Sequence, residues 1–175
     1  AVDSTLAGEE SQINGTYTFG TLAADAAAFS VSAAGLYHVV IDMDSEQYFI
    51  IPVTSWGVVG DATEMGWSGE IAMPEVSLTS TAGTWEITNL VLRGGVYKFR
   101  YNNGWKVLND AFIIFSNFGF NGETPVMGDA NITFDGANEG LYTLTLSWSA
   151  TDGFSYTATR TGDVEPLPEY PAALY

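Results

Sequence analysis

The chain has 175 residues and no cysteine, and its 21 acidic residues against five Lys and Arg give a formal net charge of −16. Such a negative field repels phosphate backbones, which argues against a nucleic-acid partner. The lack of cysteine excludes disulfides and thiolate metal sites. No apolar run reaches the roughly 18 residues that a membrane-spanning helix needs. The length suits one sandwich-sized domain plus part of another.

Short apolar or alternating runs recur along the whole chain and predict strands. They lie at residues 17–19, 29–31, 36–41, 48–53, 56–59, 84–88, 96–101, 112–115, 131–134, 141–148 and 154–159. Turn signals separate them, such as Arg93-Gly94-Gly95, Asn102-Asn103-Gly104 and Asn121-Gly122. Many short strands joined by glycine and asparagine turns predict an all-β chain folded as a β-sandwich.

Two distant segments are similar and indicate a repeated unit. "AAGLYHVVIDMDSEQYFIIPV" (33–53) and "NEGLYTLTLSWSATDGFSYTAT" (138–159) share a Gly-Leu-Tyr start, a polar turn and an aromatic second strand. Leu36 aligns with Leu141, 105 residues later, about the length of one immunoglobulin-like domain.

This repeat predicts the domain boundaries. Residues 1–53 would supply strands of a preceding sandwich repeat, whole or partial, and residues 54–162 would form one complete sandwich. Residues 163–175 read as a proline-rich linker followed by the start of a further repeat, "AALY". We therefore expect the chain to be part of a longer, multi-domain protein.

A basic cluster lies in the middle of the chain, where "GGVYKFRYNNGWKVLND" holds most of the cations. Strand alternation places Lys98 and Arg100 together on one face, opposite three aromatic residues that we assign to the core. Trp105 follows directly after an Asn-Asn-Gly turn. The simpler interpretation is a solvated strand face whose cations relieve a crowded acidic surface.

A ligand with both hydroxyls and flat apolar faces suits this cluster. The C–H groups of a pyranose ring stack on an aromatic face, and its hydroxyls bond to Lys and Arg donors. Trp67 ends the glycine-flanked stretch "WGVVGDATEMGW" (56–67) and could form an angled platform with Trp105. Alternatively, Trp67 plugs the end of the sandwich. Trp85 and Trp148 lie in alternating strands, and we assign them to the core.

Three segments together resemble a known family: "WGVVGDATEMGW", "GTWEITNLVLRGGVYKFRYNNGW" and "GDANITFDGANEGLYTLTL". They are similar to the starch-binding repeat of the SusE/SusF outer-membrane lipoproteins of Bacteroidetes, over roughly residues 54–162. Residues 28–53 resemble the end of a preceding copy. The resemblance implies an immunoglobulin-like β-sandwich that acts as a carbohydrate-binding module for starch or another α-glucan.

Carried over to this sequence, the resemblance places the platform on Trp67 and Trp105 and the donors on Lys98 and Arg100. Asn109 or Asp110 would supply a further polar contact. It implies no cofactor and no metal, a polysaccharide as partner, and other outer-membrane glycan-uptake proteins as further partners. It also implies a position on the cell surface at the outer membrane, with membrane attachment only through a lipid anchor on the parent chain.

Residue patterns for catalysis are weak. Glycoside hydrolysis uses two carboxylates at a defined separation, and no spacing singles out a pair among the acids. His38 lies in an alternating strand, and the acidic turn at 42–46 lacks the glycine and the distal acid of a calcium loop. We therefore expect a non-catalytic protein. Binding of another glucan such as laminarin, or a spacer sandwich without a ligand, remain the alternatives.

Overall fold

The computed structural model describes residues 12–13, 15–25, 28–109 and 112–164. The described residues are almost entirely strands and turns, with one short 3-10 helix at Gly136–Asn138 and no α-helix. The prediction of an all-β chain is therefore confirmed. No described segment forms a helix of the length and apolarity that a membrane crossing requires.

The strands form four sheets, and every strand pair within them is antiparallel. The largest has the order β12 (Thr124–Met127), β11 (Asn117–Asn121), β8 (Gly95–Tyr101), β4 (Trp56–Gly60) and β5 (Gly66–Met73), with β13 (Ile132–Phe134) also paired to β8. The second has the order β15 (Gly153–Gly162), β14 (Gly140–Ser149), β7 (Ala82–Leu92) and β6 (Glu75–Leu78). The third has the order β1 (Thr18–Thr21), β3 (Gln47–Val53) and β2 (Leu36–Asp42), and the fourth joins β10 (Phe112–Phe115) to β9 (Lys106–Asn109).

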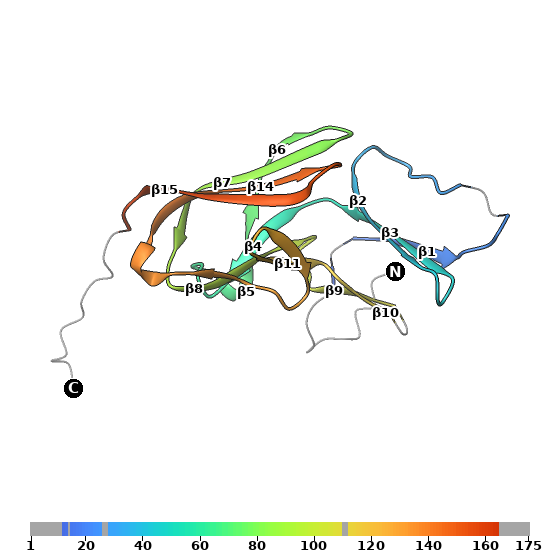
Figure 1. The fold of residues 1–175 in the computed structure, drawn as a ribbon, viewed down its shortest axis with the longest axis horizontal. Helices are drawn as coiled ribbons and strands as arrows, with labels where there is room; N and C mark the ends of the chain where they lie inside the picture. Colours follow the sequence, from blue (N-terminus) through green and yellow to red (C-terminus); the bar gives the residue numbers. More distant parts are fainter. Residues whose placement is uncertain (1–11, 14, 26–27, 110–111, 165–175) are drawn as a thin grey trace.

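The two larger sheets lie face to face, as in a β-sandwich (Figure 1). Their inward side chains alternate with outward ones, so Leu144 and Leu146 of β14 are fully buried against Phe99 of β8. Trp56 and Trp85 meet across the core with their ring centroids 5.8 Å apart. Trp85 is buried, as the alternation predicts, and Trp148 is half-buried at the edge of the same core.

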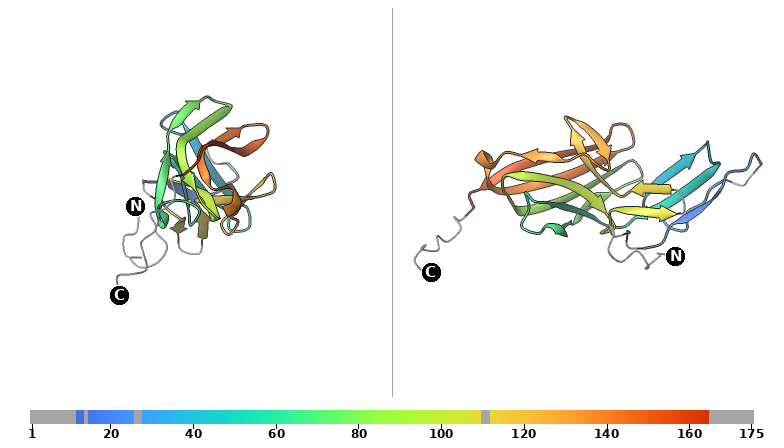
Figure 2. Two further views of the ribbon diagram at one scale, coloured as in Figure 1. Left: turned by 90° about the vertical axis from the view of Figure 1, so that its left-hand side faces the viewer. Right: turned by 90° about the horizontal axis from the view of Figure 1, so that it is seen from below.

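The third and fourth sheets extend one end of the sandwich and make the molecule elongated (Figures 1 and 2). Phe49 and Ile51 of β3 are fully buried and belong to the same apolar core as the sandwich. Phe49 also lies 5.2 Å from Phe112 of β10, measured between ring centroids. Strand β3 is thus packed onto the sandwich end by apolar contacts.

The two similar sequence segments also share a local structure. The hydroxyls of Tyr37 and Tyr142 each donate to the carbonyl four residues earlier, at 2.8 Å and 2.7 Å. Their surroundings differ, because Leu144 is fully buried in the sandwich whereas the aligned Val39 is 49% exposed. The first copy thus carries the strand pattern of a sandwich sheet without an opposing sheet over Val39.

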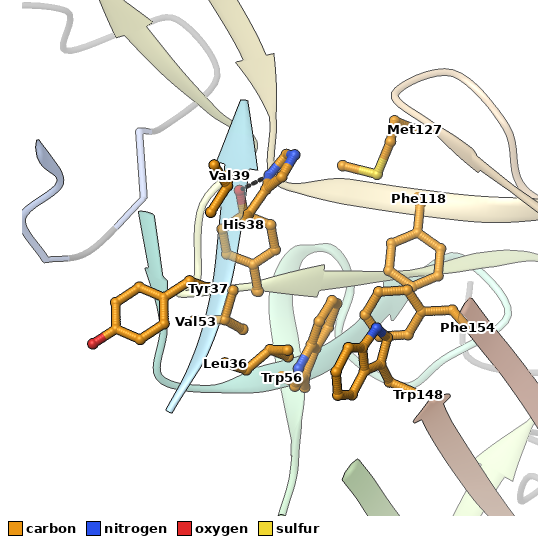
Figure 3. A pocket seen from close by; sticks show the side chains of 11 residues that line it. Leu36, Tyr37, His38, Val39, Val53, Trp56, Phe118, Met127, Trp148 and Phe154 are labelled. Carbon is orange, nitrogen blue, oxygen red and sulfur yellow. Dashed lines mark hydrogen bonds between the residues drawn. The ribbon is translucent and has the colours of Figure 1, made fainter. Parts of the chain in front are cut away.

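An apolar cavity of about 390 Å³ lies between β2 and the end of the sandwich (Figure 3). Its wall is largely aliphatic and aromatic, with Trp56, Trp148 and Phe154 on one side. The His38 imidazole Nδ1 and the Tyr101 hydroxyl form a 2.8 Å hydrogen bond at its edge. Burial lowers the pKa of His38, which favours the neutral imidazole.

Candidate functional site

A polar and aromatic groove of about 490 Å³ lies on the face of the largest sheet that points away from the core. Strands β5, β8, β10 and β11 and two connecting segments form it. The residues that line it are Trp67, Lys98, Trp105, Phe115, Asn117, Gly128, Asp129 and Asn131. The groove therefore combines flat apolar faces with amide, carboxylate and ammonium groups.

Trp67 and Trp105 form one side of the groove, with ring centroids 6.0 Å apart and planes inclined by 36°. Trp67 is 40% exposed, and Trp105 is half-buried. The glycine that precedes Trp67 has a left-handed backbone (Gly66 φ 58°), and the β4–β5 register is irregular between Val58 and Gly60. This turn, which a side chain would strain, directs the Trp67 indole outward.

Lys98 lies at the floor of the groove, but its side chain is not solvated. The residue is only 5% exposed, and its Nζ donates to Asn117 Oδ1 at 3.0 Å and to the carbonyl of Gly128. Strand alternation predicts the correct face for Lys98. It does not predict the burial, because the Gly128 segment that covers the ammonium lies 30 residues further along the chain.

Arg100 contacts Trp105 and is not among the residues that line the groove. It is 4% exposed, and its Nε donates to Glu70 Oε2 at 2.6 Å. Its Nη2 donates to Asn103 Oδ1 at 2.9 Å, and its Cζ lies 4.8 Å from the Trp105 ring centroid. We expected Arg100 to face the ligand as a hydrogen-bond donor. In the structure its guanidinium instead contacts Glu70, Asn103 and Trp105.

Asn109 lies away from the groove. It ends β9, where its Nδ2 is 3.4 Å from the Tyr17 hydroxyl, and it does not line the site. The β9–β10 hairpin extends toward the N-terminal sheet, which carries Asn109 away from Trp105 (Figure 1). Asp110 lies outside the described residues, as does the predicted start of a further repeat within residues 165–175.

Five groove residues were not anticipated from the sequence: Phe115, Asn117, Gly128, Asp129 and Asn131. A signal for three of them exists, because "GDAN" (128–131) repeats the "GDAT" of residues 60–63 within the same domain. Gly128 has φ 82°, and a Cβ there would lie 3.0 Å from the Phe115 ring. This glycine lets the Phe115 ring, 38% exposed, lie against the groove wall.

Direct hydrogen bonds link the groove residues to one another. Asn117 accepts from Lys98 through Oδ1 and donates through Nδ2 to the carbonyl of Trp105 at 2.8 Å. A single buried amide therefore fixes both the ammonium and the backbone of the tryptophan. Because these bonds are already made, the floor of the groove is organised before any ligand arrives.

The chemistry of the groove suits a neutral polyhydroxyl ligand. The indoles offer stacking faces, and the exposed Asp129 and Asn131 offer hydrogen-bond acceptors and an amide donor. Asp129 is the one carboxylate among the described lining residues, whereas glycoside hydrolysis uses a pair. Within the described residues, no three His, Asp or Glu side chains gather as a metal site.

Comparisons with known proteins give no significant match: no family model matches the chain, and neither the curated proteins nor the solved structures contain a significant match.

Proposed function

We propose that this protein binds a neutral polysaccharide, most specifically starch or another α-glucan, without catalysing its breakdown. The observation that carries the proposal is the inclined Trp67–Trp105 pair beside a polar groove on an otherwise regular sheet face. An outward tryptophan exposes apolar surface to water, which is unfavourable, and a sugar ring that stacks on the indole removes this surface from water.

The incline between the two indoles favours a curved chain. Successive glucose units of an α-1,4-glucan turn relative to one another, so two faces inclined by 36° can each accept one unit. A flat β-1,4-glucan would present its units in nearly one plane. The similarity of residues 54–162 to SusE/SusF starch-binding repeats supports the same ligand class. It also supports an immunoglobulin-like module displayed at the outer membrane beside other glycan-uptake proteins.

Two alternatives make different demands on the groove. Laminarin is also curved and would use the same indoles. Only a binding measurement with different oligosaccharides therefore distinguishes laminarin from α-glucan as the ligand. A spacer without a ligand would have no use for an exposed indole, and the 40% exposure of Trp67 disfavours that interpretation. The apolar cavity in Figure 3 is a poorer sugar site, since its described wall offers few polar groups.

Titration of tryptophan fluorescence tests the proposal. Addition of a linear α-1,4-gluco-oligosaccharide should change the emission with a dissociation constant on the order of 10 μM to 1 mM, as expected for an open groove. A laminarin-derived oligosaccharide and a cellulose-derived one serve as comparison ligands. If none of the three oligosaccharides changes the emission, glucan binding is contradicted. If only the laminarin fragment changes it, the ligand is a laminarin-type β-glucan and not an α-glucan.

A further inference from the structure

The Glu70–Arg100 ion pair lies next to Trp105 and is almost wholly withdrawn from solvent. The two side chains are 11% and 5% exposed, and their nitrogen and oxygen atoms are 2.6 Å apart. A buried ion pair adds little stability over apolar residues of the same size, because both ions lose their hydration. Its presence here is consistent with a role other than stabilising the sandwich.

The pair is formed across an intervening strand. Glu70 lies in β5 and Arg100 in β8, with β4 hydrogen-bonded between them. Gly57 of β4 stands opposite Arg100, and a Cβ at this position would lie 2.7 Å from the Glu70 side-chain Cδ. The glycine thus leaves the passage through which Glu70 reaches the guanidinium.

The other side of Arg100 faces the Trp105 turn. Its Nη2 donates to Asn103, a residue with a left-handed backbone (φ 51°) in the turn that leads to Trp105. The guanidinium also lies over the Trp105 ring, 4.8 Å from its centroid. Arg100 consequently holds both the turn and the ring, while Glu70 holds Arg100. The fork of an arginine can do this and the single ammonium of a lysine cannot.

We infer that Glu70 and Arg100 are positioning residues, which set the orientation of the Trp105 indole relative to Trp67. In this arrangement Arg100 influences the ligand through Trp105 and makes no direct bond to it. The part of this inference that concerns the ligand rests on the proposed glucan binding. The part that concerns the indole pair does not, and it can be measured in the free protein.

Near-ultraviolet circular dichroism tests the orientation without a ligand, because two indoles 6.0 Å apart couple optically. The contribution of the pair is the difference between the parent spectrum and that of Trp67→Phe. The double variant Glu70→Met with Arg100→Met removes both charges together, so neither ion is left buried alone. We expect the pair signal to fall to about half or less while the far-ultraviolet spectrum stays that of a β-sheet protein.

Two single variants refine the test. Arg100→Lys keeps the charge but not the fork, so its pair signal should also fall. Arg93→Met removes a half-exposed arginine that bonds Glu139, in a different part of the sandwich, and should leave the signal unchanged. If the double variant and Arg100→Lys are folded and retain the full pair signal, the positioning role is refuted.

Binding of an α-1,4-gluco-oligosaccharide gives the second readout. The double variant should bind about tenfold more weakly, in step with its lost pair signal. Weaker binding with an unchanged pair signal would mean that Arg100 contacts the sugar directly, which also overturns the inference. If the parent protein binds no glucan, the proposed function fails, and the dichroism alone decides the positioning of Trp105.

Discussion

Trp105→Ala removes the half-buried member of the indole pair and should abolish most binding of α-glucan. Stacking one pyranose on the Trp105 face withdraws roughly 80 Å² of apolar surface from water. At about 25 cal/mol per Å² this contributes about 2 kcal/mol, or a factor of about 30 in the dissociation constant. Since the parent constant is expected on the order of 10 μM to 1 mM, the constant of the variant should rise to about 0.3 to 30 mM, and its retention on an α-glucan affinity gel should fall sharply.

The thermal stability of the same variant separates a binding role from a core role. Trp105 is half-buried and rests partly on Arg100, so its truncation should cost about 1 to 2 kcal/mol, a few degrees in Tm. Trp148→Ala is the matched control, because Trp148 is also half-buried but lines the apolar cavity away from the groove. It should lose stability and keep binding. If Trp105→Ala retains parent-like binding while its Tm falls, the assignment of the groove is refuted.

Three further experiments probe the floor of the groove, the junction with the N-terminal sheet and the core. Lys98→Met removes the buried ammonium bonded to Asn117, and we expect it to weaken glucan binding and to lower the Tm. Calorimetry should show a loss of about 1 to 3 kcal/mol in the free energy of unfolding. An unchanged Tm would show that the ammonium is solvated. His38→Gln keeps a neutral hydrogen-bonding group for Tyr101 and should reduce the fall of Tm between about pH 7.5 and about pH 5. Burial lowers the pKa of His38, so the unfolded chain binds the proton more readily than the folded protein. The folded state of the parent therefore loses stability as the pH falls below about 6.5. An equal fall of Tm in the parent and in His38→Gln would contradict this reasoning. Leu144→Ala should cost about 2 to 5 kcal/mol in urea unfolding, whereas Val39→Ala at the aligned, exposed position should cost less than about 1 kcal/mol, and equal losses would show that Val39 is covered.

Local sequence patterns predicted many of the strands, because alternation depends on neighbouring residues, but they gave no signal for β5, β6, β9, β11 and β12. Residues 29–31, predicted as a strand, lie outside any strand, and Trp105, expected to face outward with Trp67, is half-buried. Alternation placed Trp85 inward, and the glycine before Trp67 marked a turn that the structure shows with a left-handed backbone. The pairing of Trp67 with Trp105 required that two distant turns converge. The structure brings these two side chains together with Lys98.

The interactions that reached across the sheet were not predictable in the same way. Alternation assigns a face but does not show which later segment covers it, so the bonds of Lys98 to Asn117 and to Gly128 gave no local signal. The same holds for Arg100, whose partner Glu70 arrives over Gly57 from two strands away. Proximity to Trp105 in sequence also misplaced Asn109, because the hairpin that follows Trp105 turns toward Tyr17.

Native gel electrophoresis in the presence of soluble starch tests the central claim most directly. The acidic chain migrates readily toward the anode, so retardation by an uncharged polymer reports binding alone. Parallel gels contain laminarin, a cellulose-type polymer or no polysaccharide. The proposed function predicts that starch slows the parent protein, that the cellulose-type polymer does not, and that Trp67→Ala with Trp105→Ala migrates equally in all gels. Equal mobility of the parent protein in every gel would contradict glucan binding at this groove.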